Sequence, residues 1–155
     1  MEDFTLKGYS DSDYASDVAT RRSVTGYVYT MGSAPIAWRS KTQTTVALSS
    51  TEAEYMALGA TVAEGLYLKR LVAEFGYIPA MQIYGDNMSS LHMVRNPSSN
   101  QKSKHIDVRH HFIRDHFASG MFQLEHLGTE VMVADMLTKS LAKALHEKHR
   151  GQLMY

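Results

Sequence analysis

The chain contains no cysteine, which excludes disulfide bonds and thiolate metal sites. No apolar run approaches the ~20 residues that cross a membrane, and the opening MEDFTLKGYSD lacks the basic and apolar regions of a secretory signal. Net charge is also absent, because 16 Lys and Arg residues balance 16 Asp and Glu residues. Strong nucleic-acid-binding domains are usually basic. These absences are compatible with an intracellular protein and argue against binding of nucleic acid through charge alone.

What is present is the composition of an ordinary globular protein. The chain has 155 residues, of which 44% are hydrophobic and 21% are charged. That length suffices for one hydrophobic core. We predict a single domain over residues 1–150, followed by a short C-terminal tail over residues 151–155.

The pattern along the chain predicts a mixed α/β domain. Strands are predicted where apolar and polar residues alternate or where β-branched and aromatic residues gather: residues 4–10, 23–33, 34–49, 81–85 and 121–127. Helices are predicted where apolar residues recur every three to four positions: residues 50–75, 87–95, 105–119 and 130–148. This order predicts a mixed sheet that is flanked by helices.

Four carboxylates stand at the ends of apolar segments or on the predicted helices. Asp11 and Asp86 each follow a strand, Glu54 opens the long helix, and Asp135 lies in the last helix. Ionised groups near apolar surroundings lose hydration, and two carboxylates ~4 Å apart repel by about 4 kcal/mol at an effective dielectric near 20. A multivalent cation relieves that repulsion, and an all-oxygen site favours magnesium or manganese. Because ligands gather at the carboxyl ends of parallel strands, the pattern predicts a metal-dependent enzyme.

The sequence gives little support to two other kinds of site, a calcium-binding EF-hand loop and a serine-hydrolase triad. Asp11, Asp13 and Asp17 could begin an EF-hand loop, but that loop needs Gly at its sixth position and Glu at its twelfth. Those positions hold Ser16 and Arg22, which argues against calcium binding. The chain also has no G-x-S-x-G segment, so nothing supports a serine-hydrolase triad.

Basic residues concentrate between the third and fourth carboxylates. Lys, Arg and His side chains crowd into the 22 residues from Arg95 to His116. Beside an acidic metal site such a stretch could hold a phosphate backbone. A solvated helix face is the alternative, and the charge pattern alone does not decide between the two.

Five segments resemble the ribonuclease H domain of copia-type (Pseudoviridae) retrotransposon Pol polyproteins. They are GYSDSDYASDVATRRSVTGYVYTMG, PIAWRSKTQTTVALSSTEAEYMAL, IYGDNMSS, KSKHIDVRHHFIRD and VADMLTKSL, in the order of that family. The resemblance implies a ribonuclease H-like α/β fold with a five-stranded mixed sheet flanked by helices. It also implies that the basic-protrusion helix is lacking, because the stretch between Asp86 and Asp135 is short. Gly85 and Ser140 replace a cysteine and a proline that are frequent in the family, and neither position is a metal ligand.

The resemblance also implies an activity. The family cleaves the RNA strand of RNA–DNA hybrids with two Mg²⁺ ions, for which Mn²⁺ can substitute. Carried over residue by residue, Asp11 resembles the acid that bridges both ions, and Glu54, Asp86 and Asp135 resemble the other ligands. His126 resembles a mobile histidine that shuttles protons or helps the product to leave, which suits a group that titrates near neutral pH. The alternative for His126 is a strand-end residue that faces water.

The expected partners are the RNA–DNA hybrid and the reverse transcriptase domain of the same polyprotein, with no membrane. The residues expected to contact nucleic acid are Asn87, Ser89, Lys104, His105 and Arg109. The expected location is a cytoplasmic virus-like particle, with the nucleus as the alternative. A catalytically silent connection domain, or a binding domain co-opted by the host, is the competing hypothesis. The presence of all four acids favours the enzyme.

Glu52 and Glu54 compete for the second ligand position. They point about 160° apart on a helix, so only one can face the metals. Glu52 can form a capping box with Ser49, and Glu54 can form one with Thr51, so capping does not decide. The apolar stripe places Glu54 with Leu58 on the side that faces the sheet, and the family motif agrees with that choice.

Overall fold

The computed structural model describes residues 4–96 and 104–154. For residues 104–107 it describes the backbone but not the side chains. Five strands form one sheet: β1 (Leu6–Asp13), β2 (Val24–Met31), β3 (Ala34–Thr42), β4 (Met81–Gly85) and β5 (Gln123–His126). Their order is β3-β2-β1-β4-β5. Strands β1, β2 and β3 pair antiparallel, whereas β1, β4 and β5 are parallel. The five-stranded mixed sheet predicted from the sequence is confirmed.

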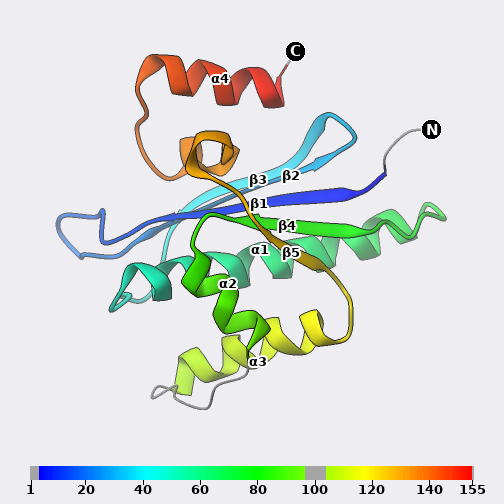
Figure 1. Cartoon of the computed structure of the whole chain (residues 1–155), viewed down its shortest axis with the longest axis horizontal. Helices are drawn as coiled ribbons and strands as arrows, with labels where there is room; N and C mark the ends of the chain where they lie inside the picture. Colours follow the sequence, from blue (N-terminus) through cyan, green and yellow to red (C-terminus); the bar gives the residue numbers. More distant parts are fainter. Residues whose placement is uncertain (1–3, 97–103, 155) are drawn as a thin grey trace.

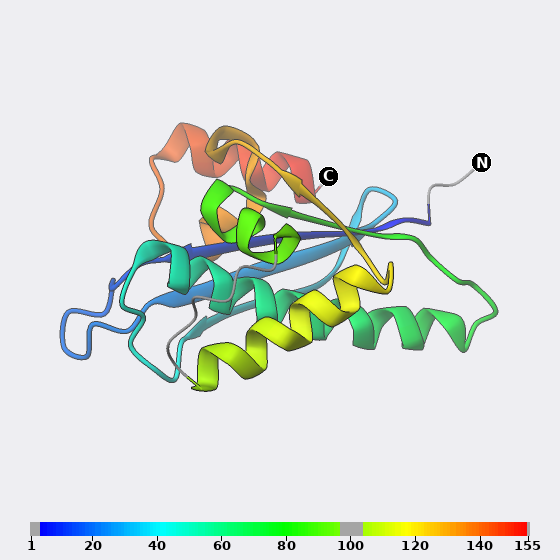
Figure 2. The same ribbon diagram turned by 60° about the horizontal axis from the view of Figure 1, so that its bottom comes forward.

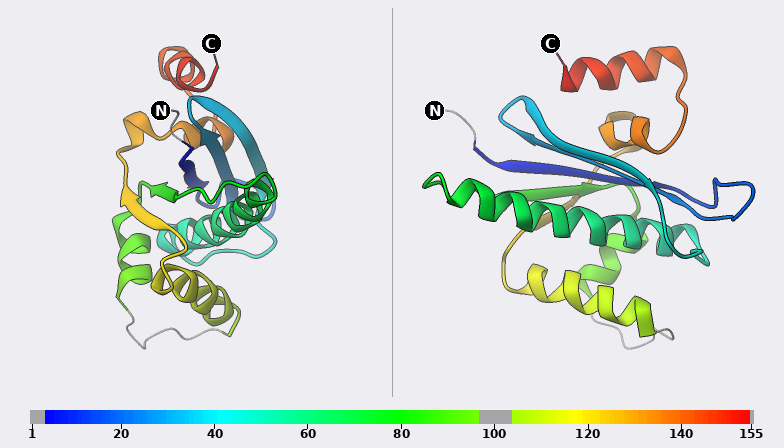
Figure 3. Two further views of the ribbon diagram at one scale, coloured as in Figure 1. Left: turned by 90° about the vertical axis from the view of Figure 1, so that its right-hand side faces the viewer. Right: turned by 180° about the vertical axis from the view of Figure 1, so that it is seen from behind.

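Helices cover both faces of this sheet (Figure 1). One face carries α1 (Ser50–Ala73), α2 (Met88–Arg95) and α3 (Lys104–Ala118). The other face carries two 3₁₀ turns, η1 (Thr129–Val131) and η2 (Val133–Leu137), and the last helix, α4 (Lys143–Leu153). Figure 3 shows the resulting layers from the side, and Figure 2 shows α3 beside the long helix α1.

The main core lies between the sheet and α1. It is made of buried aliphatic and aromatic side chains, among them Tyr29, Tyr55, Leu58, Val62, Ile83 and Ile113. Tyr29 is fully buried and donates a hydrogen bond to the backbone carbonyl of Thr61 at 2.5 Å. Burial of apolar surface, worth about 25 cal/mol per Å², fixes α1 against β1 and β2. The long helix is therefore a rigid support for the residues at its start.

The start of α1 is capped as the sequence predicted for Glu52. Ser49 is the N-cap residue, and its hydroxyl accepts from the backbone N–H of Glu52 at 3.1 Å. The Glu52 carboxylate in turn accepts from the backbone N–H of Leu48 at 2.9 Å. The prediction that strand character continues to residue 49 is wrong. Gln43 instead ends the strand region by donating to Thr25 Oγ1 and to the carbonyl of Ala53.

The single helix predicted over residues 130–148 is also wrong. The chain forms η1 and η2 there, and α4 begins only at Lys143. The segment is held by contacts across the sheet, since Thr138 donates to Asp11 Oδ2 at 2.5 Å. Gly26 on β2 permits this approach, because a Cβ there would lie 2.6 Å from Thr138 Cγ2. Local helical periodicity was therefore overridden by tertiary contacts.

The segment predicted as a tail over residues 151–155 is helical at its start. Helix α4 continues to Leu153, which packs against the buried cluster around Val28 and Met132. Between α2 and α3, no further helix lies in the residues that the structure describes. No helix within the described ranges is long and apolar enough to cross a membrane.

Candidate metal centre and nucleic-acid interface

The register of two parallel strands brings Asp11 and Asp86 together. Ser10 on β1 is the partner of Gly85 on β4, and each acid is the next residue along its strand. Asp86 directly follows β4, as predicted, whereas Asp11 lies within β1 because that strand continues to Asp13. Asp11 is 1% exposed. A buried carboxylate in a strand is costly unless it is compensated, so this position requires an explanation.

Glu54 approaches the same point from α1. The backbone N–H of Ser12 donates to Glu54 Oε1 at 3.2 Å, which ties the helix start to β1. Ligand oxygens of Asp11, Glu54 and Asp86 all lie within 4.8 Å of one another. Glu52 is occupied as the helix cap, so Glu54 is the glutamate that faces the other acids, in agreement with the sequence analysis.

Asp135 reaches the cluster from the opposite face of the sheet. It lies in η2, is 2% exposed, and its carboxylate is close enough to Asp11 and Asp86 to raise the pKa of both. Lys139 connects it to the rest of the site. The Lys139 Nζ lies 2.8 Å from Asp135 Oδ1 and 3.6 Å from Asp11 Oδ2. All four acids predicted as ligands are therefore brought to one place.

Burial and mutual repulsion favour the protonated acids. Burial is the main cause that raises the pKa of Asp11 to about 7, against the opposing hydrogen bond from Thr138 and the charge of Lys139. Burial, followed by the charges of Asp11 and Asp86, raises the pKa of Glu54 to about 8. The pKa of Asp86 is raised by burial and then by Asp135. Each shift marks a site where extra negative charge is unfavourable.

For Lys139, in contrast to the acids, the surroundings favour the charged form. Burial would lower the pKa of its ammonium, but the carboxylates of Asp135 and Asp11 outweigh that effect and raise the pKa above its ordinary value. One lysine does not balance the site. Asp11 Oδ1 is buried without a hydrogen-bond partner in the described part of the chain. An all-oxygen set with an unpartnered buried carboxylate oxygen fits a hard divalent cation such as Mg²⁺ or Mn²⁺.

His126 lies beside this cluster. On β5 it is the register partner of Gly85 on β4, and its Nε2 lies 3.1 Å from the backbone carbonyl of Asp86. A carbonyl oxygen only accepts hydrogen bonds, so Nε2 is the protonated ring nitrogen in this contact. The side chain is exposed. His126 thus lies next to the backbone of Asp86, and its role in proton transfer stays a prediction.

The predicted nucleic-acid contacts occupy different positions. Asn87 is the N-cap of α2 and accepts from the backbone N–H of Ser90 at 2.8 Å, while Ser89 is exposed on the first turn of that helix. Arg109 is exposed on α3. The side chains of Lys104 and His105 lie outside the described residues, so the structure does not place them.

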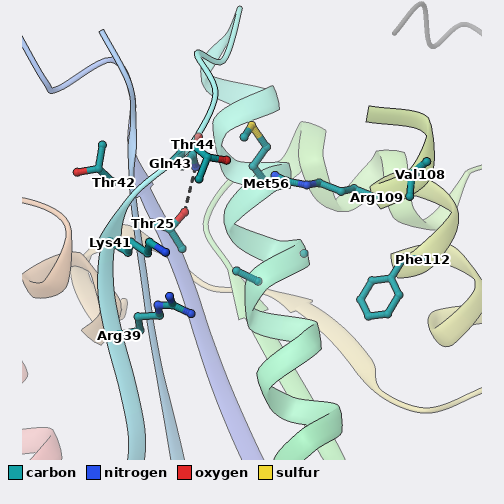
Figure 4. A pocket seen from close by; sticks show the side chains of 12 residues that line it. Thr25, Arg39, Lys41, Thr42, Gln43, Thr44, Met56, Val108, Arg109 and Phe112 are labelled. Atoms are coloured by element: carbon teal, nitrogen blue, oxygen red, sulfur yellow. Dashed lines mark hydrogen bonds between the residues drawn. The ribbon is translucent and has the colours of Figure 1, made fainter. Parts of the chain in front are cut away.

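Arg109 lines a groove of about 460 Å³ between α3, α1 and the edge strand β3 (Figure 4). Arg39 and Lys41 extend from β3 on the other side of this groove. Its floor includes Met56, which is two residues beyond Glu54 on α1. The groove also includes Thr25, the register partner of Ser12 next to Asp11. Basic side chains from β3 and α3 therefore flank a groove that runs along α1, the helix that carries Glu54.

The fold is shared with known ribonucleases H. LC11-RNase H1, solved in complex with an RNA/DNA hybrid, superposes with a TM-score of 0.63 at 14% sequence identity. The superposition covers 86% of this chain and 94% of that chain. The architecture is thus that of a ribonuclease H-type domain. No family model matches the chain.

Sequence relatives identify the family more closely. The retrovirus-related Pol polyprotein from transposon TNT 1-94 of Nicotiana tabacum is 41% identical over 135 residues, which is 86% of this chain. The corresponding polyprotein from transposon RE1 of Arabidopsis thaliana is 35% identical over 151 residues, or 96% of this chain. The chain belongs to the copia-type retrovirus-related Pol polyproteins. It spans 10% of the length of each of these two relatives.

Sequence reasoning did not find four residues that the structure places at the site. Thr138 and Lys139 were hidden because the segment was predicted as helix, where Asp135 and Lys139 would form an ordinary surface pair at i, i+4. Arg39 and Lys41 lie on an edge strand, 70 and 68 positions before Arg109 in the sequence. The alternation of basic residues on β3 was the one available signal for that pair.

Proposed function

We propose that this domain hydrolyses the RNA strand of RNA–DNA hybrids by metal-dependent catalysis. The observation that carries the proposal is the convergence of Asp11, Glu54 and Asp86, with oxygens within 4.8 Å, where β1 passes the carboxyl end of β4 in a ribonuclease H-type sheet. Asp135 joins them through Lys139. The solved relative that holds an RNA/DNA hybrid, and the Pol polyprotein family of the sequence relatives, support this substrate class.

The four acids would hold two Mg²⁺ ions, or Mn²⁺ in their place, which supply an activated water and stabilise the leaving oxygen. The protein's part is to fix these ligands on rigid elements. Asp11 is held by the sheet and by Thr138, and Glu54 is held by the capped start of α1 and by Ser12. His126, whose Nε2 contacts the carbonyl of Asp86, is positioned to carry a proton to or from the scissile region.

The groove between β3 and α3 would hold the backbone of the hybrid next to the acids. Arg39, Lys41 and Arg109 supply positive charge there in a protein whose formal net charge is +0. Phosphate contacts of this kind position a substrate without reading its sequence. Recognition of RNA would come from contacts to the 2′-hydroxyl across the shallow minor groove. In the full polyprotein, the reverse transcriptase domain would deliver the hybrid.

A gel assay with labelled substrates tests the proposal. The wild-type domain should cut the RNA of an RNA–DNA hybrid in Mg²⁺ or Mn²⁺, leave duplex DNA intact, and stop in excess EDTA. Asp86→Asn should remove cleavage, because it deletes a proposed ligand while keeping the shape of the side chain. Equal cutting by wild type and Asp86→Asn would contradict the assignment of these acids.

A catalytically silent binding domain is the second hypothesis, and the same assay separates it. A silent domain would bind the hybrid in the presence and absence of metal without cutting it. Joining the reverse transcriptase domain would then leave cleavage absent, whereas an enzyme that merely needs its partner would gain activity. The retention of all four acids at one point favours the enzyme, because nothing in binding alone requires four buried or half-buried carboxylates to meet.

A further inference from the structure

Asp11 presents its two oxygens to two different environments. Oδ1 is buried and has no hydrogen-bond partner within the described residues. Oδ2 accepts a hydrogen bond from the Thr138 hydroxyl at 2.5 Å and lies 3.6 Å from Lys139 Nζ. One carboxylate thus joins a region without a cation to a region that already contains one.

The region with the cation is built from η2 and β1. Lys139 Nζ lies 2.8 Å from Asp135 Oδ1 as well as 3.6 Å from Asp11, so a single ammonium is shared by two carboxylates. These side chains are 3% and 1% exposed, whereas the lysine side chain is 34% exposed. The lysine enters from the solvent side and places only its charged end between the acids.

The other side of the cluster differs. Neither Glu54 nor Asp86 forms an ion pair in the part of the chain that the structure describes. Yet their oxygens lie within 4.8 Å of an oxygen of Asp11. A divalent cation can enter among these three acids without displacing a positive charge. A cation that binds between Asp11 and Asp135 must instead displace the ammonium of Lys139.

We propose that Lys139 is a stand-in cation that occupies the Asp11–Asp135 position in the metal-free protein and withdraws when a second divalent ion binds there. The inference rests on the proposed function, since it concerns the same four acids. Lys139 is a positioning residue in this account, because it keeps Asp11 and Asp135 in place until the ion arrives. Its flexible four-carbon stem allows the ammonium to move into water without disturbing the core.

Competition between lysine and metal has a measurable cost. When the state that can bind is only partly populated, the apparent Kd rises in inverse proportion to that population. An ammonium that occupies the position in about nine of ten molecules would weaken binding of the second ion about tenfold. The first ion, held by Asp11, Glu54 and Asp86, would be little affected. The two ions should therefore bind in order and with different affinities.

Calorimetric titration of Mn²⁺ into the metal-free domain tests the proposal. Lys139→Met keeps the stem and removes the charge, and should tighten the second binding event about tenfold while the first changes little. Lys143→Met is the matched control, because the one ion pair of Lys143 among the described residues is with Glu147 at 3.9 Å on the surface of α4. That control should leave both events unchanged. An unchanged or weaker second event in Lys139→Met would overturn the proposal, because a permanent structural ion pair gives that result.

A second measurement uses the wild-type protein and does not depend on how a variant folds. Acetic anhydride modifies free amines, and mass spectrometry reports its rate at each lysine. Saturating Mn²⁺ should speed modification of Lys139 severalfold, because the ammonium is released, while Lys143 keeps its rate. A Lys139 rate that stays constant or falls on metal binding would overturn the proposal. Lys139→Arg, which retains the charge, should retain weak binding of the second ion.

The outcomes also separate this inference from the proposed function. A wild-type domain that binds no Mn²⁺ and cuts no hybrid would refute both. A domain that binds two ions and cuts the hybrid, but whose affinity for the second ion is the same with and without the Lys139 ammonium, would refute only the stand-in role.

Discussion

Acidic side chains gather at one place in this molecule and basic side chains at another, and the protein holds the two groups in opposite ways. The acids Asp11 and Asp135 are buried on core elements, tied to backbone and side-chain partners, and costly to ionise together. The basic residues Arg39, Lys41 and Arg109 are exposed and line the groove between β3, α1 and α3. Buried like charges are tolerated where a ligand compensates them. Exposed like charges cost little and act through screened attraction.

The contrast implies that a change among the acids will be severe and a change in the groove will be mild. The acids are rigidly placed and depend on one another through distances of a few ångströms. The basic residues come from separate elements and contribute independently.

The largest effect should come from Glu54. Glu54→Gln should lower cleavage by more than about a hundredfold, above the 10–100-fold typical for residues that only support metal ligands. Glu52→Gln is the matched control two positions away and should cost at most about 1 kcal/mol of stability, because a glutamine oxygen can also accept the capping hydrogen bond, with cleavage retained. Gel cleavage and thermal melting measure the two effects. An inactive Glu52→Gln beside an active Glu54→Gln would reverse the assignment.

A smaller effect should follow neutralisation of the groove. Arg109→Gln should weaken binding of the hybrid severalfold and reduce the slope of log affinity against log salt by about 1, because one phosphate contact is lost. Wild-type binding itself should be weak and steeply salt-dependent. Fluorescence anisotropy over a salt series measures both. Arg150→Gln on α4, at the opposite face of the sheet, serves as the control, and an equal loss in both variants would speak against the groove.

Asp11 and Glu54 should also make the free energy of unfolding of the metal-free protein depend on pH. The pKa of Asp11 is raised from 3.8 to about 7 and that of Glu54 from 4.5 to about 8. The folded state therefore binds more protons than the unfolded state between about pH 4 and pH 8, and the free energy of unfolding falls as pH rises through this window. Melting in EDTA should drop by several degrees from pH 5 to pH 8.

Two variants calibrate that pH experiment. Glu54→Gln removes one raised pKa and should flatten the decline. Asp115→Asn, at an exposed position of α3, should leave it unchanged. A metal-free wild-type protein that becomes more stable over the same range would show that these acids are not desolvated as the structure places them.

The sequence predicted the sheet and the three helices on one face because burial follows simple periodicity there. Strand β4 matches its predicted range of 81–85, and Glu54 was separated from Glu52 by the apolar stripe, in agreement with the family motif. The segment around Asp135 was not predictable in this way. Its conformation depends on Gly26, which is remote in sequence, and on the hydrogen bond from Thr138 to Asp11. The groove was not predicted for the same reason, because Arg39 and Arg109 are far apart in the sequence and line one groove only in the folded chain.

The most direct test of the account is the melting temperature of Asp86→Asn with and without metal. Asp86 lies in the acidic cluster and forms no ion pair within the described residues, and burial and the charge of Asp135 raise its pKa against the attraction of Lys139, so its neutralisation relieves repulsion without breaking an ion pair. In EDTA, Asp86→Asn should melt a few degrees higher than wild type. In saturating Mn²⁺ the order should reverse, because the ion stabilises the wild type that binds it more tightly. A variant that melts lower than wild type in both conditions would contradict a clustered, cation-binding set of acids.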